Sequence, residues 1–488
     1  MGGVPLCPTR LCMLFNSLEF VAFFLGVYCL YLVLTHRWQN RMLLVASYVF
    51  YGAWDWRFLS LIWLSTIIDY FCGAKIHEAQ DARKRKLFLY LSLATNLLLL
   101  GFFKYFNFFS ASFQELSAIL GFSVQPNFLR IVLPVGISFY TFQTMSYTID
   151  IYRYKLRPAV NFFDFALFVA YFPQLVAGPI ERAKQLLPQI ENPRTITLEK
   201  ISEGMYLILW GYVLKVFVAD NIAGIADDIF LSKAFCNGAF LPLGLYAFAI
   251  QIFGDFAGYS NIARGLAKCM GIDLMVNFNL PYCAKNPQDF WRRWHISLST
   301  WLKDYLYVSL GGNKRGRFLT YRNLFITMVL GGLWHGAAWT FVLWGVYHGV
   351  GLAIHRSLQP FLTRVPEFKN AVVRHVWSGF RMLCCFHFVC FGWLIFRAES
   401  LSHLKRLVAI LTGNFHFGSG FGLKDTLLRI ILYSLPVIVM QFFQYRGNDL
   451  MVARKLNPVA KAILYNIFLA LIIFFGNYGG NEFIYFQF

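Results

Sequence analysis

Charged residues are scarce in this sequence. Only 14% of its 488 residues are Asp, Glu, Lys or Arg, whereas a soluble globular domain carries about 25%. Hydrophobic residues make up 58% of the chain, and apolar runs close to twenty residues long recur along its whole length. A membrane helix needs about twenty apolar residues, and a barrel strand about ten alternating ones. The sequence therefore predicts an all-α integral membrane protein with no soluble domain.

Familiar catalytic signatures are also missing. The sequence has no GxSxG, Walker A, HExxH or dinucleotide-binding GxGxxG motif, which argues against a soluble-type hydrolase or ATPase. Its ten cysteines form no CxxC pair and have no metal-ligand spacing, so we expect them to be structural. His348 and His355 lie two helical turns apart but lack a third ligand. We therefore expect helix packing there and no metal site.

Acidic residues are fewer than basic ones, 24 against 44, which gives a net charge of +20. The basic residues gather in short segments between apolar runs, at Arg83–Lys86, Tyr152–Arg157 and Asn313–Arg317. This pattern is typical of cytoplasmic loops that meet anionic lipid headgroups. We expect the Arg83–Lys86 loop in the cytoplasm, the lipid bilayer as a partner, and no nucleic acid.

Thirteen apolar segments are candidate membrane helices. The runs at Leu133–Phe142 and around His335 are interrupted by Gly or Pro, and a broken helix at membrane depth needs protein or a water-filled cavity around it. We expect 11–13 transmembrane or re-entrant helices around a central tunnel, in one membrane-embedded domain over 13–488 that follows an uncertain extension at 1–12. The segments are 17–35, 42–54, 57–74, 87–109, 131–150, 162–178, 204–222, 239–257, 324–340, 341–355, 377–396, 426–445 and 461–478.

The segment Gln288–Tyr307 has the period of a helix. At 100° per residue its aromatic and leucine residues form one stripe, beside a basic polar side. This pattern predicts one continuous helix in the membrane interface, started by Asn286–Pro287. Ser299, one turn after His295, is a candidate partner of that histidine, which is equally well explained as a solvated polar residue. The polar faces also carry the candidate site residues Arg292, Lys303 and Asp304.

The stretch "GGLWHGAAW", Gly331–Trp339, places His335 in a nearly uncharged apolar run. An ionisable residue inside a membrane is by default a functional hypothesis. Burial favours the neutral imidazole, which is the form that a general base needs, and the flanking glycines allow close approach of a substrate. The alternative is a core histidine bonded to a carbonyl; we favour function.

Other polar residues lie in or beside apolar segments. Asp255, Ser260 and Asn261 follow an apolar span, where they could line a cavity or cap helices. Lys215 lies within a candidate membrane span, and we expect it to extend its ammonium group to an interface.

Four stretches together resemble the membrane-bound O-acyltransferase (MBOAT) family, and its bacterial alginate O-acetyltransferase (AlgI-like) branch most of all. They read "LVAGPIERAKQLLPQI", "QIFGDFAGYSNIARGLAKCMGI", "NFNLPYCAKNPQDFWRRWHISLSTWLKDYLYVSLGGNKRG" and "TMVLGGLWHGAAWTFVLWGVYHG". The ends "MLFNSLEF" and "EFIYFQF" fit the same branch. The core motifs lie at 277–349, and Trp334 and Asn313 within them join the candidate tunnel-lining residues.

The resemblance implies a ring of membrane helices, some interfacial or re-entrant, around a thin funnelled centre. It implies that His335 is the catalytic residue and that His295 is the second histidine of the motif. The implied reaction is transfer of an acyl group, in this branch acetyl, to a hydroxyl, with His335 as general base. The implied donor is acetyl-CoA or a carrier-protein thioester on the cytoplasmic side, with no bound cofactor.

The resemblance also implies a bacterial inner membrane location, exported SGNH-type acetyltransferase partners, and a polysaccharide acceptor such as alginate or another cell-envelope glycan. One position departs from the branch pattern, because "GYSN" has Asn261 where such sequences often have aspartate. This substitution puts an acidic role at that position in doubt.

Two alternatives stay open. The first is D-alanyl transfer to teichoic acid (DltB-like), which shares the motifs and the catalytic histidine. The second is a transporter or flippase for an acyl donor or lipid-linked glycan, which basic loops and a polar cavity would also suit.

Overall fold

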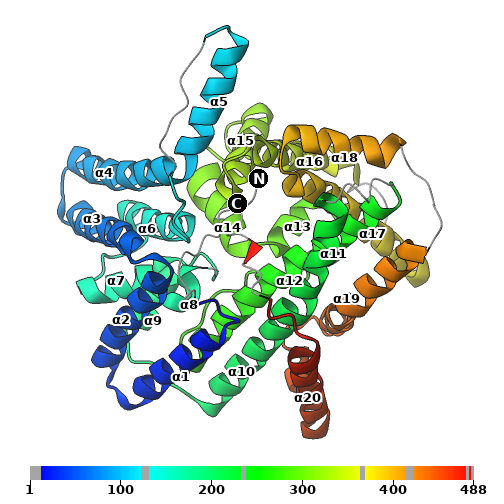
Figure 1. Ribbon diagram of the computed structural model, residues 1–488. Helices are drawn as coiled ribbons and strands as arrows, with labels where there is room; N and C mark the ends of the chain where they lie inside the picture. The colour runs from blue at the N-terminus through cyan, green and yellow to red at the C-terminus, as the bar shows by residue number, and fades with distance from the viewer. Residues whose placement is uncertain are drawn as a thin grey trace. The chain divides into compact units, whose positions relative to one another are not determined.

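The computed structural model describes residues 13–122, 131–176, 178–231, 238–362, 369–413, 421–479 and 483–484. Within these ranges the regular structure is entirely helical, as the composition predicted (Figure 1). The suggested extension at 1–12 lies outside the described residues. The chain divides into two compact units, one of residues 1–208 and 261–275 and the other of residues 209–260 and 276–488.

Seven helical stretches in the described ranges are apolar and long enough to cross a membrane. The last of them, Pro458–Phe475, has a mean hydropathy of 2.1, and only 6% of its apolar window is buried inside the protein. Exposed apolar surface of this extent is suited to lipid and not to water. The other six are His36–Glu78, Ala82–Ile119, Leu198–Leu231, Phe240–Cys269, Ala371–Arg397 and Gly422–Gly447.

The first unit contains the helices of the N-terminal part of the chain. Arg83–Lys86, which we predicted as a loop, instead forms the first turn of a helix whose N-terminus Asp81 caps by accepting from the Arg83 amide. The helices are α1 (Leu18–Val33), α2 (His36–Asp55), η1 (Trp56–Phe58), α3 (Leu59–Glu78), α4 (Ala82–Leu100), η2 (Gly101–Tyr105), α5 (Phe106–Ile119), α6 (Ile137–Tyr152), α7 (Phe162–Ala170), α8 (Phe172–Leu175), α9 (Ala183–Glu191), most of α10 (Leu198–Tyr212) and the end of α12 (Phe240–Cys269).

The second unit contains both histidines of the motif. It includes the first two-thirds of α12 and a chain of short helices before the longer C-terminal ones. Its other elements are the π-helical η3 (Val213–Ala219), α11 (Asp220–Leu231), η5 (Pro281–Cys283), α13 (Pro287–Arg293), α14 (Ile296–Trp301), the π-helical η6 (Leu302–Tyr307), α15 (Arg317–His335), α16 (Trp339–Leu362), α17 (Ala371–Arg397), α18 (Leu401–Gly413), α19 (Phe421–Gly447), η7 (Val452–Lys455) and α20 (Pro458–Phe475).

The prediction of one continuous helix over Gln288–Tyr307 was wrong. Asn286 caps α13 as predicted, accepting from the Asp289 amide at 2.8 Å, but the helix ends at Arg293. There the carbonyl of Arg293 accepts from the Asn279 amide, and the Ile296 amide donates to the Asn277 carbonyl, each at 2.9 Å. These bonds to the preceding segment replace helical ones, so the chain breaks before α14 begins.

Helices α15 and α16 lie side by side (Figure 1), and glycines bring their backbones together. A β-carbon on Gly345 would lie 2.5 Å from the carbonyl oxygen of Met328, closer than real β-carbons approach, and one on Gly332 would overlap the carbonyl oxygen of Phe341. Small residues permit this close approach between membrane helices. The α15–α16 hairpin ends α15 at His335 and therefore positions this histidine.

Substituting Gly345 by Ala should destabilise the protein because the added methyl group forces the two helices apart. Overpacking of this kind costs about 1–3 kcal/mol, and we expect a lower thermal midpoint for the purified protein in detergent. Gly379→Ala in α17 is the matched control, since nothing lies within 4 Å of its β-carbon position. An unchanged midpoint for Gly345→Ala would contradict the proposed close packing.

Candidate active site

His335 is the last residue of α15 and is only 4% exposed. Its ring lies in an aromatic environment, with the ring centroids of Trp344 at 4.9 Å, Trp334 at 5.1 Å and Phe396 at 5.5 Å. A β-carbon on the following residue, Gly336, would overlap the ring of Phe341. The glycine after the histidine is therefore required by packing, and the helix break predicted at this run is confirmed.

His295 lies in the break between α13 and α14 and is completely buried. Its backbone is in the left-handed region, with φ of 43° and ψ of 55°. A non-glycine residue there costs of order 1–3 kcal/mol, and such strain is found preferentially at functional sites. The fold therefore places this imidazole inside the protein, where a continuous helix would have left it on a polar surface.

Asn277 fixes the orientation of His295. Its side-chain oxygen accepts from the Ser297 amide at 3.2 Å and from the Ser297 hydroxyl at 2.9 Å, and it lies 3.2 Å from Nδ1 of His295. Because a backbone amide can only donate, the atom that it faces must be the amide oxygen. His295 therefore carries its proton on Nδ1, and Nε2 is an acceptor.

The surroundings of His295 keep the imidazole neutral. The residue lies outside the candidate membrane-spanning helices, and burial lowers its pKa to about 3. The ring of Phe256 lies nearly perpendicular to the imidazole, with centroids 4.6 Å apart. Near neutral pH the imidazole is therefore neutral.

The substitution Asn277→Ala should lower the rate of acyl transfer about tenfold or more. It removes the oxygen that accepts from the Ser297 amide and hydroxyl and faces Nδ1 of His295, so the imidazole loses its fixed orientation, and a barrier increase of about 1.4 kcal/mol is tenfold in rate. Turnover of the purified protein measures the effect. Asn466→Ala on α20, whose amide bonds only the carbonyl of Ala462, is the control, and equal turnover for the two variants would contradict the assigned role.

The structure brings His335 and His295 together although forty residues separate them in the chain. Their ring centroids lie 6.5 Å apart at an interplanar angle of 60°. The ring of Trp334, a predicted site residue, lies 5.9 Å from that of His295. Ser260 on α12 belongs to the same group, because Asn277 donates to its hydroxyl at 3.3 Å.

The remaining predicted site residues differ in exposure and in their bonding partners. Arg292 and Lys303 are exposed, Asp304 is half-buried on η6, and Asn261 accepts from Arg264 at 3.2 Å within α12. Ser299 is not the partner suggested for His295, since its hydroxyl donates to the carbonyl of Trp294 at 3.1 Å. Asn313 is exposed and lines a hollow of about 580 Å³ near the start of α15, together with Arg317, Tyr321 and Arg356.

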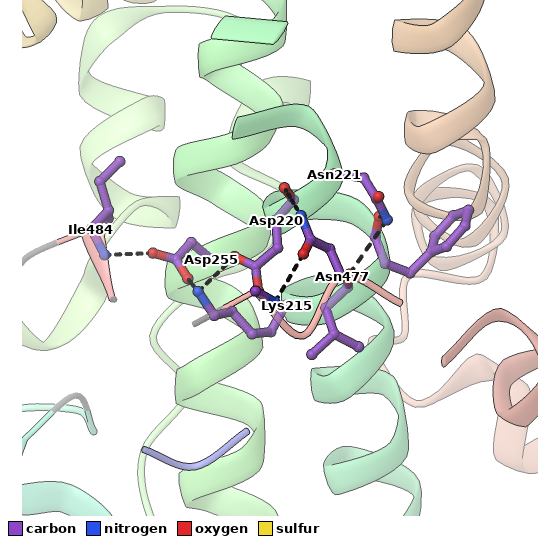
Figure 2. Close-up of polar contacts among 9 residues, drawn as sticks. Lys215, Asp220, Asn221, Asp255, Asn477 and Ile484 are labelled. Atoms are coloured by element: carbon purple, nitrogen blue, oxygen red, sulfur yellow. Dashed lines mark hydrogen bonds and ion pairs between the residues drawn. The ribbon is translucent and has the colours of Figure 1, made fainter. Parts of the chain in front are cut away.

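Asp255 and Lys215 belong to a separate buried network (Figure 2). Lys215 lies on η3, is 1% exposed, and contacts carboxylate oxygens of Asp220 and Asp255 at 2.8 Å each. The prediction that Lys215 reaches an interface was therefore wrong, because two carboxylates hold its ammonium group inside the protein. Asp220 and Asn277 are polar partners that the sequence did not reveal, since neither has a motif spacing to its partner.

His348 is buried against aromatic rings, with Trp344 at 4.7 Å and Trp291 at 5.2 Å between centroids, which confirms helix packing at this residue. In the described part of the chain, no three His, Cys, Asp or Glu side chains gather as metal ligands would.

These features describe an integral membrane protein with two buried, neighbouring imidazoles. The sequence profile of the membrane-bound O-acyltransferase family matches residues 154–396. A probable alginate O-acetylase AlgI of Pseudomonas aeruginosa is 45% identical over 443 residues, which cover 89% of this chain and 82% of that protein. A peptidoglycan O-acetyltransferase of Helicobacter pylori is 36% identical, covering 82% of this chain and 80% of that protein.

A teichoic acid D-alanyltransferase of Bacillus subtilis is more distant, at 27% identity over 55% of this chain and 70% of that protein. The chain belongs to the membrane-bound O-acyltransferase family. It is therefore an acyltransferase and a multi-pass membrane protein, as the resemblance of its motifs indicated.

Proposed function

We propose that this protein transfers an acetyl group to a hydroxyl on, or destined for, an exported cell-envelope polysaccharide, with His335 as the catalytic base. The observation that carries the proposal is the convergence of His335 and His295, buried and 6.5 Å apart. Each hydrogen bond from a ring nitrogen to an oxygen spans about 2.9 Å. One reacting oxygen can therefore lie within reach of both rings.

In the proposed reaction His335 takes the proton of the acceptor hydroxyl as its oxygen attacks the carbonyl carbon of an acetyl thioester. The tetrahedral intermediate then expels the thiolate, which takes up a proton, and the products are an O-acetyl ester and a free thiol. His295, held in place by Asn277, lies beside the base and positions the hydroxyl oxygen by contact, while the single hydroxyl proton goes to His335. Exclusion of water by the surrounding rings protects the thioester from hydrolysis.

The donor in this proposal is acetyl-CoA, bound from the cytoplasmic side of the bacterial inner membrane, with a carrier-protein thioester as the alternative. The two most similar relatives described above act, by their names, on alginate and on peptidoglycan. Their shared chemistry is an O-acetylated envelope polysaccharide. Exported SGNH-type partners would complete the transfer to the glycan, and Arg83–Lys86 would face the cytoplasm.

The test is to measure ester-linked acetyl and ester-linked D-alanine in the exported polymers of cells that carry or lack this gene. We expect acetyl esters to depend on the gene and D-alanyl esters not to. If the D-alanyl esters depend on the gene and the acetyl esters do not, the reaction is D-alanyl transfer to teichoic acid and not acetyl transfer. Dependence of neither ester, with export of an acyl donor or lipid-linked glycan lost, would establish a transporter.

A further inference from the structure

The C-terminal segment, here residues 476–479 and 483–484, is bound to the interior of the second unit at two points. Near its start the Asn477 amide donates to the carbonyl of Val216 at 2.8 Å, and the Asn477 side chain donates to the carbonyl of Asp220 at 3.1 Å. The Val216 carbonyl lies on η3, where the π-helical geometry changes the usual backbone pairing. π-helical turns are frequent at functional sites.

The second anchor is the Ile484 amide, which donates to Oδ2 of Asp255 at 2.6 Å (Figure 2). The other carboxylate oxygen of Asp255 faces the ammonium group of Lys215 at 2.8 Å. A backbone amide bonded to a carboxylate is a charge-assisted hydrogen bond, stronger than a neutral one. Lys215, which also pairs with Asp220, thus holds the carboxylate of Asp255 in position to accept from the Ile484 amide.

Each of the two residues joined at this anchor is followed or preceded in the chain by a phenylalanine. Phe483 precedes Ile484, is completely buried, and has its ring centroid 5.5 Å from that of Phe256 and 4.6 Å from that of Tyr259. Phe256 follows Asp255, and its ring lies edge-on to His295 at 4.6 Å. Ring contacts therefore connect Phe483, beside the anchor, through Phe256 to the imidazole of His295.

We infer that Asp255 is a positioning residue of the acyl transfer: it anchors the C-terminal segment so that Phe483 and Phe256 hold and shield His295. The expected effect on turnover rests on the proposed function. The expected effect on the shielding of His295 rests only on the contacts described above. The sequence suggested Asp255 as a tunnel-lining residue, and the inference assigns it instead to holding the C-terminal segment inside the protein. Its physical basis is that an edge-on ring fixes the plane of the imidazole only while the ring itself is fixed.

The test uses the purified full-length protein in lipid nanodiscs, with radiolabelled acetyl-CoA as the probe donor. Ile484→Pro removes the donating amide, and Ile484→Ala is its control because it keeps that amide. Asp255→Ala removes the acceptor and leaves Lys215 paired with Asp220, whereas Asp255→Asn retains an acceptor oxygen. Asp425→Asn, on an exposed ion pair with Arg429, controls for loss of a carboxylate.

Two quantities are measured. The first is the rate at which diethyl pyrocarbonate modifies His295, followed by mass spectrometry, which reports shielding of the imidazole without any need for activity. The second is kcat and KM for the probe donor. We expect Ile484→Pro and Asp255→Ala to raise the modification rate at least tenfold and to lower kcat at least tenfold, with KM within twofold, at a temperature below the unfolding midpoint of every variant.

Asp255→Asn should recover most of the shielding and of kcat, and the Ile484→Ala and Asp425→Asn controls should stay within twofold of wild type. An unchanged modification rate in both anchor variants would overturn the inference. If turnover persists in His335→Ala while His295 becomes reactive in the anchor variants, the proposed function fails and the anchor stands. If His335→Ala is inactive and the anchor variants are indistinguishable from wild type, only the anchor fails.

Discussion

Replacing His335 by alanine should reduce acyl transfer by about 10²–10⁴-fold, the usual contribution of a positioned general base. The imidazole is buried against Trp334, Trp344 and Phe396, and none of these side chains can act as a base in its place. Turnover of the purified protein at matched amounts gives the ratio directly. His295→Ala, measured alongside, should reduce turnover less, because it removes a neighbour that positions the hydroxyl and not the base.

His375→Ala on α17 is the matched control, since that histidine is exposed and bonds only the carbonyl of Ala371. It should leave turnover within twofold of wild type. Loss of activity in His335→Ala counts toward catalysis only if the unfolding midpoint stays close to that of wild type. Full activity in the His335 variant would exclude this residue as the base.

Replacing Lys215 by methionine should be the most destabilising single change considered. The lysine is 1% exposed between Asp220 and Asp255, and its loss leaves two buried carboxylates facing each other. Removal of one partner of a buried ion pair costs about 3–5 kcal/mol. Unfolding titrations in mixed detergent micelles should show this loss in the free energy of unfolding.

Two further variants separate charge from packing at this position. Lys405→Met on the exposed side of α18 should change the free energy of unfolding by less than about 0.5 kcal/mol, as is usual for surface substitutions. The triple variant Lys215→Met, Asp220→Asn, Asp255→Asn removes the unpaired charges and should recover most of the loss. A stable single variant would show that the network carries little of the fold's stability.

Part of the site could be predicted from the sequence because, in an apolar run, the cost of an ionisable side chain can be judged from its neighbours in the sequence. A histidine in an uncharged run is unusual wherever it falls in three dimensions, so His335 could be selected without a structure. The helix break beside it could also be predicted, because glycines interrupt this apolar run, but only the structure shows that Gly336 makes room for the ring of Phe341. The predicted segment 17–35 agrees within two residues with α1, whereas α2 and α17 each begin six residues before the predicted start.

Other features of the site could not be predicted because they depend on contacts between residues far apart in the sequence, which the helical period of a segment does not reveal. The helical period of Gln288–Tyr307 is real, but hydrogen bonds from Asn277 and Asn279 interrupt the helix at His295 and turn that residue inward. Asn277 itself lies eighteen residues before the imidazole that it orients. No local rule connects the two, because their proximity is a property of the folded chain.

The sequence by itself was enough to identify a membrane protein, its helical class and its family, and to select His335 as a candidate site residue. Each of these follows from composition or from a contiguous motif. Only the tertiary structure decided which polar groups meet: His295 with His335 and Asn277, and Lys215 with Asp220, Asp255 and, through Asp255, the backbone at Ile484. The reason is physical, since a buried polar group must find a partner wherever the fold provides one, and the distance along the chain does not determine which partner that is.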